Sequence, residues 1–262
     1  MTMDTAHYQE LFEQEATYWW HVGKRRIGDA LLGDPGALRT NSLLQDRRVL
    51  DLGCGAGFNL QCLRRYGSAV GLDVSPDALR LARQRQVSLL CQADCAEGLP
   101  FRAETFDLVT AFDVLEHVRE DHWLMAELAR VLKPGGRLLV HVPAYPWLYS
   151  YWDRAHGHYR RYTRGRLQDL LASASLTVQR LSYCHALTLG PAVLVRWVKE
   201  KAPAERESDF LPVPSWMNRL LLGYYMAESY WLRRWNLPCG LSLCAVAQKP
   251  QVPAASLGGV RV

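Results

Sequence analysis

Residues 49–57 read VLDLGCGAG, and this stretch decides the fold. Apolar residues lead into an acid, Asp51, and then into Gly53, Gly55 and Gly57 at alternate positions. A strand that ends in such a glycine loop before a helix lets the backbone approach a ligand without a Cβ in the way. It also directs the N–H groups of the helix N-terminus at that ligand. The Asp51 carboxylate suits a ligand that carries an ammonium group better than one that carries pyrophosphate.

The order of elements around this loop predicts an α/β fold. Strands are expected at residues 48–52, 69–73, 87–92, 106–112, 137–142, 176–183 and 242–248. Helices are expected at residues 7–20, 25–32, 58–66, 76–84, 121–132, 164–174, 191–201 and 215–235. Alternating strands and helices imply a doubly wound, mostly parallel sheet with helices on both faces. Such sheets bind ligands at the carboxyl ends of their strands.

Two further acids follow the second and third expected strands. Asp73 comes roughly 20 residues after the glycines, where an acid accepts hydrogen bonds from both ribose hydroxyls. Asp94 ends the third strand and can reach an adenine amino group. Each acid alone is more often a helix cap or a turn residue. Their joint occurrence at successive strand ends favours a ligand with a nucleoside part.

These motifs together resemble the class I S-adenosylmethionine-dependent methyltransferases. The resemblance is strong over residues 45–145 and weak elsewhere, and it includes FDLVTAFDVLEH at 106–117 and VLKPGGRL at 131–138. It implies a Rossmann-like, seven-stranded sheet and S-adenosyl-L-methionine as the cofactor. By this likeness the cofactor-binding residues are Asp51, Gly53, Gly55, Gly57, Asp73, Val74, Asp94, Cys95 and Asp113.

Three further segments are similar to a small-molecule subgroup that is often associated with glycan or lipid pathways. They are YWW at 18–20, VPAY at 142–145 and GHYRRY at 157–162. The resemblance implies a small-molecule or lipid-linked acceptor. The alternative is a cofactor-binding scaffold or regulatory protein without catalysis of its own.

Methyl transfer is an in-line displacement that needs an aligned acceptor and a base for its proton, and no metal. The expected catalytic residues are His117, His158 and Tyr162, and the expected substrate-binding residues are Trp20, Tyr145, Arg160 and Arg161. Other interpretations stay open: His117 could pack against the cofactor, Trp20 against the core, and the arginines could cap helix 164–174 or pair with Asp153.

Oxygen is favoured as the methylated atom. The chain has Phe112-Asp113-Val114-Leu115 where amino-group methyltransferases of DNA have an Asn/Asp-Pro-Pro-aromatic tetrad. Histidine bases are also available. The basic residues are dispersed, which argues against nucleic acid as a substrate.

The late helix expected at 215–235 carries many aromatic residues. Core packing is the favoured interpretation, and the alternatives are an acceptor pocket, a homodimer face or a peripheral membrane contact. The segments are expected to be an N-terminal helical cap (1–46), the α/β core (47–185), a helical insertion (186–236), the last strand (237–249) and a disordered tail (250–262).

Composition places few further limits. The 262 residues are 49% hydrophobic and carry a net charge of +5, as expected for a globular protein. The seven cysteines are scattered without a C-x-x-C pair, so neither a zinc site nor a disulfide framework is expected. No signal peptide or membrane span is expected, and a cytoplasmic location follows as the default.

Overall fold

The computed structural model describes residues 5–34, 36, 38, 43–86, 89–199 and 213–251. Its helices are α1 (Thr5–Gln14), α2 (Trp19–Leu32), α3 (Phe58–Leu63), α4 (Pro76–Gln84), α5 (Asp121–Val131), α6 (Tyr151–Ala155), α7 (Arg164–Ser173), α8 (Ala186–Lys199) and α9 (Ser215–Leu232). Its strands are β1 (Arg48–Leu52), β2 (Ser68–Asp73), β3 (Leu90–Gln92), β4 (Phe106–Phe112), β5 (Leu132–Pro143), β6 (Thr177–Cys184) and β7 (Ser242–Gln248). Short 3-10 helices lie at Leu44–Asp46, Arg64–Tyr66, Leu115–His117 and Pro146–Leu148.

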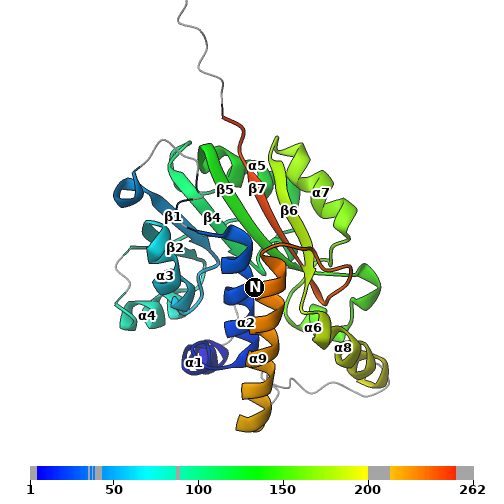
Figure 1. Cartoon of the computed structure of the whole chain (residues 1–262). Coiled ribbons are helices and arrows are strands. Elements are labelled where there is room, and N and C mark those ends of the chain that lie inside the picture. Colours follow the sequence, from blue (N-terminus) through cyan, green and yellow to red (C-terminus); the bar gives the residue numbers. More distant parts are fainter. Residues whose placement is uncertain are drawn as a thin grey trace, which may run out of the picture.

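The strands form one seven-stranded sheet in the order β3-β2-β1-β4-β5-β7-β6 (Figure 1). Strands β1 to β5 run parallel to one another, and β7 runs antiparallel to both β5 and β6. The order of the strands reverses between β1 and β4. Ligands bind at such a reversal, outside the carboxyl ends of the strands. The predicted α/β fold is therefore confirmed, and the expected ligand position lies beyond the ends of β1 and β4.

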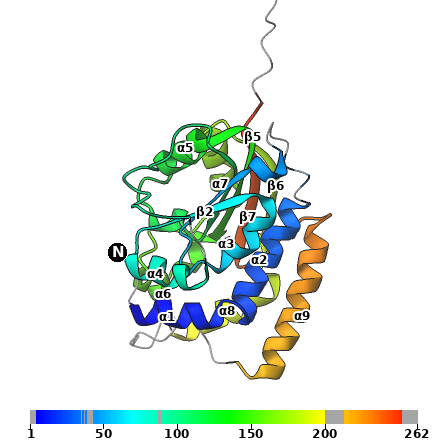
Figure 2. The same cartoon turned by 90° about the vertical axis from the view of Figure 1, so that its left-hand side faces the viewer.

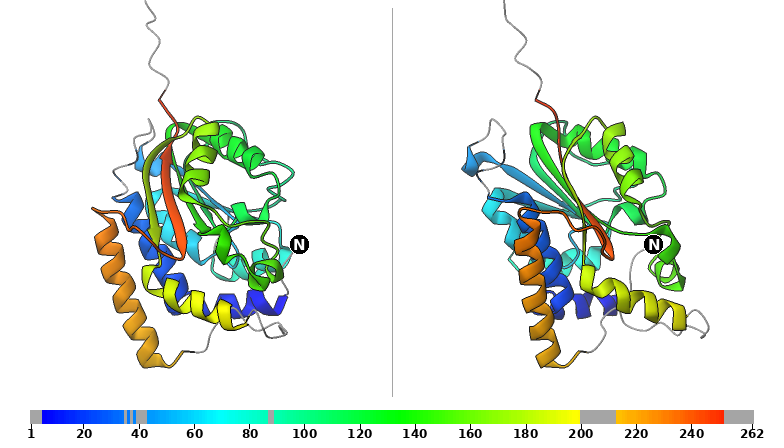
Figure 3. Two further views of the ribbon diagram at one scale, coloured as in Figure 1. Left: turned by 90° about the vertical axis from the view of Figure 1, so that its right-hand side faces the viewer. Right: turned by 45° about the vertical axis from the view of Figure 1, so that its right-hand side comes forward.

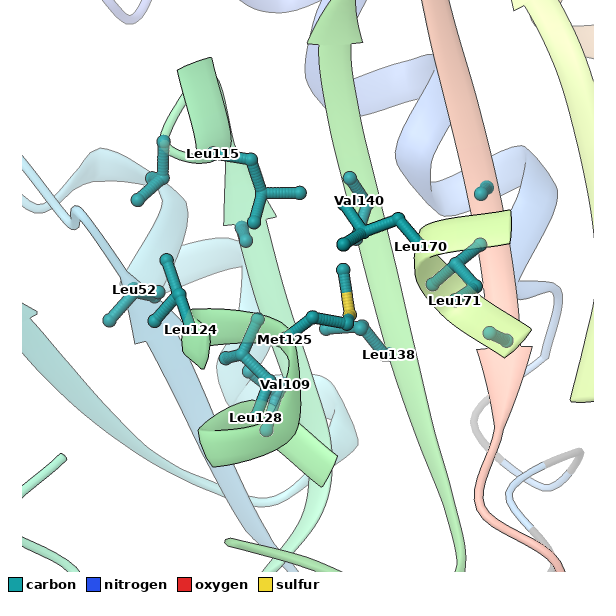
Figure 4. Close-up of a cluster of buried hydrophobic side chains, with 14 of the residues drawn as sticks. Leu52, Val109, Leu115, Leu124, Met125, Leu128, Leu138, Val140, Leu170 and Leu171 are labelled. Carbon is teal, nitrogen blue, oxygen red and sulfur yellow. The ribbon is translucent and has the colours of Figure 1, made fainter. Parts of the chain in front are cut away.

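Two apolar clusters cover the two faces of the sheet. On one face, α5 and α7 pack against β4 and β5, and Figure 4 shows their leucines and Met125 between the layers. On the other face, α2, α3 and α9 supply a second cluster that includes Ile27, Leu60, Tyr225 and Leu232 (Figure 2). Burial on both faces explains why the central strands are continuous apolar runs.

The N-terminal helices break at a different place from the one that the sequence predicts. Helix α1 ends at Gln14, and Trp19 and Trp20 open α2 instead of closing the first helix. Trp19 is buried in α2 against Tyr225 of α9, with the rings stacked at 5.7 Å. Trp19 and Ile27 belong to the same apolar cluster. Packing in this cluster therefore places Trp19 in the same helix as Ile27, which explains why α2 begins at Trp19.

Strand β5 is longer than the strand predicted at 137–142, because residues 132–136 also belong to it. Leu132 pairs with Phe106, and the register resumes at Arg137 opposite Leu108 after an irregularity. Gly135 takes a positive φ of 79° within this bulge. The glycine signal therefore marks a bulge inside the strand and not a separate loop.

Other boundaries also shift. Between β5 and α7 the chain forms the 3-10 helix at Pro146–Leu148 and helix α6, where no element was expected. Helix α8 begins at Ala186 and carries Pro191 inside it. Residues 87–88 of the expected third strand and 252–262 of the expected tail lie outside the described residues. None of the described helices is long and apolar enough to cross a membrane.

Candidate functional site

The glycine loop connects β1 to α3 and is shaped by two close contacts. Gly53 and Gly57 have φ values of 67° and 85°, which strongly favour glycine. A Cβ on Gly53 would lie 2.6 Å from Val114, and a Cβ on Gly57 would lie 2.8 Å from the Ala82 Cβ. The Gly53 N–H donates to the Leu72 carbonyl at 2.8 Å. The loop is thus fixed between β2, α4 and the residues that follow β4.

Asp73 ends β2 and is oriented by the backbone around it. Its Oδ2 accepts from the Gly55 N–H and its Oδ1 from the Ser75 N–H, both at 2.9 Å. Burial raises the pKa of this carboxyl. Each oxygen keeps a second lone pair, so the fixed carboxylate can still accept two hydroxyl hydrogen bonds. Val74 beside it exposes 42% of its surface and offers a flat apolar contact.

Asp51 lies inside the sheet with one satisfied and one unsatisfied oxygen. The Thr110 hydroxyl donates to its Oδ1 at 2.6 Å, whereas Oδ2 is buried and has no hydrogen-bond partner among the described residues. Burial raises the pKa of Asp51 to about 7. A buried carboxylate oxygen without a partner is energetically costly, and a cationic group of a ligand would satisfy it. This observation fits the ammonium group that the sequence indicated.

Asp113 follows β4 and joins three elements. Its backbone takes a positive φ of 54°. The Lys24 ammonium of α2 donates to Oδ2 at 2.7 Å, and Nδ1 of His141 lies 2.6 Å from Oδ1. Burial opposes ionisation of Asp113, but His141 and Lys24 outweigh it and hold the pKa well below its usual range. Nε2 of His141 in turn lies 3.1 Å from Nε2 of His185.

His117 and His158 meet at the end of β4. Their rings make an edge-to-face contact with centroids 4.6 Å apart. Nδ1 of His158 lies 3.1 Å from Oδ1 of Asp153, whose pKa is about 2: burial raises it, and His158 and Arg161 outweigh that effect. Burial, with His158 nearby, lowers the pKa of His117 to about 4. His117 is therefore neutral at neutral pH, and His158 is oriented by a carboxylate.

A family model matches the part of the chain that contains the glycine loop, Asp73 and Asp113. Residues 50–140, from β1 to β5, match a family model described as a methyltransferase domain. Residues 50–140 are therefore similar to a methyltransferase domain. The buried Asp51 oxygen and the Asp73 carboxylate offer acceptors that suit an ammonium group and ribose hydroxyls.

Curated relatives of the methyltransferase domain share part of its length. A ubiquinone biosynthesis O-methyltransferase of Coxiella burnetii is 34% identical over 136 residues, which are 48% of this chain and 57% of the relative. A protein of the same name from Rhizobium johnstonii is 38% identical over 112 residues, 41% of this chain and 44% of the relative. The chain thus spans about half the length of the curated relatives that it matches.

Solved structures share the fold of the methyltransferase domain. Phosphoethanolamine N-methyltransferase 2 of Haemonchus contortus, in complex with S-adenosyl-L-methionine, has a TM-score of 0.53 at 16% identity, covering 93% of this chain and 60% of that one. The [4+2]-cyclase SpnF has a TM-score of 0.56 at 20% identity, covering 87% and 82%. Because a cyclase shares this fold, likeness of fold alone does not fix the reaction.

Three predicted site residues form hydrogen bonds or ion pairs within the fold, and their roles toward an acceptor stay predictions. The buried Tyr162 hydroxyl donates to Asp121 at 2.9 Å. Arg160 pairs with the same Asp121 at 2.9 Å. Arg161 is buried and donates to Asp153 at 2.7 Å, so the alternative pairing is the one observed. Tyr162 and Arg160 thus link their segment to Asp121 of α5. Arg161 bonds within that segment, to Asp153 and to the Ala144 carbonyl.

The remaining predicted residues lie around the strand ends. Trp20 stacks on His185 with centroids 4.3 Å apart, and Tyr145 stacks on Tyr183 at 5.2 Å. The exposed Asp94 accepts from the Ala96 N–H at 2.8 Å. Burial raises the pKa of the Cys95 thiol to about 12, so the thiol is protonated at neutral pH.

Sequence reasoning missed Lys24 and His185 as parts of the site. Lys24 lies 89 positions before Asp113, and His185 lies 44 positions after His141. No local spacing links such pairs, because packing of separate elements brings them together. Two clusters also gather potential metal ligands within 4.8 Å of one another, namely Glu116-His117-His158 and His141-Cys184-Cys244.

Proposed function

We propose that this protein transfers a methyl group from S-adenosyl-L-methionine to an oxygen of a small, lipid-like acceptor. The observation that carries the proposal is the buried Asp51 Oδ2 without a partner at the end of β1. A carboxylate is destabilised there unless a cation arrives, and the cofactor supplies an ammonium group. The curated relatives named for ubiquinone biosynthesis support an oxygen as the acceptor atom.

The cofactor-binding residues divide by the part of the ligand that each would hold. Asp51 takes the ammonium group, and the glycine loop leaves room for the methionine chain. Asp73 accepts from the ribose hydroxyls, and the exposed Val74 packs on the adenine ring, with Asp94 and Cys95 at its edge. When bound, the cofactor supplies an electrophilic methyl carbon, which bonds to the acceptor oxygen while its bond to sulfur breaks.

His158 is the proposed base for the acceptor hydroxyl. Its Nδ1 faces the ionised Asp153, which fixes the ring and leaves Nε2 to accept a proton. The neighbouring His117 is neutral, so it does not repel a proton that arrives on His158. Asp113 holds Lys24 and His141 at the end of β4 and contributes a negative charge where the cationic cofactor binds.

Calorimetry with S-adenosylmethionine and S-adenosylhomocysteine tests the cofactor. We expect micromolar binding by wild type and at least a tenfold loss in Asp73→Ala, because two fixed acceptors of the ribose disappear. The matched control is Asp77→Ala, which removes an exposed acid of α4 and should leave the affinity unchanged. Absence of binding by folded wild-type protein would overturn the proposal.

Turnover is a separate test, with catechols that carry or lack a prenyl tail as probes. S-adenosylhomocysteine formation that depends on the catechol, and is faster with the tail, supports the proposed acceptor class. Tight cofactor binding without turnover on either probe would favour the scaffold or regulatory protein.

A further inference from the structure

The outward side of helix α9 is largely apolar and aromatic, with an arginine near each end. Its exposed residues recur at helical spacing of three and four positions: Trp216, Arg219, Leu220, Gly223, Met226, Ala227, Tyr230, Trp231 and Arg234. Trp216, Leu220, Met226, Tyr230 and Trp231 each expose between 49% and 61% of their surface. We call these nine residues the α9 face. Contiguous apolar faces of this kind mark interaction sites.

The opposite side of α9 is firmly packed, so the α9 face is not needed for the core. Tyr225 stacks on Trp19 of α2, and Leu232 is fully buried. Glu228 accepts from the backbone N–H groups of His185 and Ala186 at 2.6 and 3.2 Å. Figures 2 and 3 show α9 at the periphery of the molecule, with α2 on its inner side.

The exposed charged residues within the described segment 213–235 are all arginines. Arg219 and Arg234 lie on the face near its two ends, and Arg233 is exposed beside it. Glu228 is the only acid in residues 213–251, and it points inward. A partner that covers the face therefore meets apolar surface between positive charges. A negatively charged surface complements this pattern.

We infer that the α9 face docks onto an anionic phospholipid surface. Tryptophan and tyrosine rings are favoured where an apolar body meets a polar boundary, and arginines bind lipid phosphates. Helix α8 also exposes Leu187, Leu194 and Val195. Self-association is less suitable, because a two-fold pairing of α9 faces would bring arginines of the two copies together.

Vesicle co-sedimentation tests the inference, and it needs neither cofactor nor acceptor. We expect wild type to bind vesicles of phosphatidylcholine mixed with phosphatidylglycerol and to bind pure phosphatidylcholine weakly. Leu220→Glu and Trp231→Glu should each lower binding to the anionic vesicles by about tenfold or more. Arg219→Gln and Arg234→Gln should each lower it roughly fivefold at low salt.

Two matched controls separate the α9 face from general surface effects. Leu43→Glu and Trp123→Glu change residues that are similarly exposed, at 66% and 41%, but lie outside α9. Both should bind anionic vesicles as wild type does. Calorimetric binding of S-adenosylhomocysteine by every variant reports that the domain is folded. Because the proposed cofactor site is tested by that titration alone, its failure is distinguishable from failure of the membrane contact.

Three outcomes would overturn the inference. Wild type could fail to bind the anionic vesicles, or the α9 variants and the controls could bind equally well. Light scattering could instead show a dimer that Leu220→Glu converts to a monomer, which would assign the face to a second copy of the chain.

Discussion

Replacing Asp51 with asparagine should make the free protein more stable and weaken cofactor binding at the same time. The carboxyl is almost fully buried, and burial raises its pKa from an ordinary 3.8 to about 7. Among the described residues, only Oδ1 has a hydrogen-bond partner, the Thr110 hydroxyl. Asparagine has the same shape, keeps an oxygen for that hydroxyl and carries no charge. The substitution therefore removes the cost of ionising the buried group.

The size of the effect follows from the pKa. A shift of about 3 units corresponds to about 4 kcal/mol. Because the folded-state pKa of Asp51 is raised, wild type holds this stability below about pH 4 and loses it as the pH rises through about 7. Asp51→Asn loses none of it. The difference in unfolding free energy between variant and wild type should therefore grow by about 3 kcal/mol from pH 5 to pH 8.

Urea unfolding at pH 5 and pH 8, without cofactor, measures this difference. The exposed Asp77→Asn on α4 is the control and should show no such growth. Calorimetry should show that Asp51→Asn binds S-adenosylmethionine at least tenfold more weakly, because the ammonium loses its anionic partner. This prediction is contradicted if the difference in unfolding free energy is the same at both pH values, or if the variant binds the cofactor as wild type does. Asp51 would then not be a buried carboxylate that binds the ammonium group.

Three further variants test other parts of the site. His158→Gln should lower kcat about 10²- to 10⁴-fold while the cofactor affinity stays the same, and an unchanged kcat in steady-state kinetics would place the base elsewhere. Wild type should lose about 3 kcal/mol as the pH falls from 6.5 towards 4, because the buried His117 must gain a proton, and His117→Gln should not lose it in urea titrations. Exposed His122→Gln is the control for that titration. Gly57→Ala should lower the unfolding free energy by about 1 to 3 kcal/mol more than Gly157→Ala does. Both glycines have positive φ, but of the two only Gly57 has a close neighbour, Ala82. Equal unfolding free energies of the two variants would show that the contact with Ala82 relaxes without cost.

The sequence predicts the backbone geometry of the proposed cofactor site because that geometry is local. A strand, a turn that needs positive φ and an acid at the next strand end are all encoded within a few residues. Asp51, Gly53, Gly57 and Asp73 therefore lie where their spacing placed them, at the ends of β1 and β2. The parallel sheet then brings successive strand ends together without further information.

The acceptor side is not local, and the roles of its residues stay predictions for a physical reason. Residue types such as arginine and tyrosine serve equally well as substrate ligands and as fasteners, and only the tertiary partner decides between them. Asp121 and Asp153 are those partners. They form hydrogen bonds or ion pairs with the partly buried Arg160 and the buried Arg161 and Tyr162. Nothing in the spacing of residues 157–162 distinguishes the two uses.

Helix α9 shows the same ambiguity in a form that links the surface to the site. Its apolar residues surround the helix, a pattern that is consistent with burial or with a lipid contact. Packing assigns one side of the helix to the core, because α2 covers the side that carries Tyr225 and Leu232. That covered side also holds Glu228 against the backbone of His185, whose ring contacts His141 and, through it, Asp113. Since one rigid helix carries both the exposed aromatic face and this connection, docking of α9 at a lipid surface would hold the end of β4 at a constant distance from the membrane. An acceptor with an apolar tail would then meet the proposed methyl-transfer site without leaving the bilayer completely.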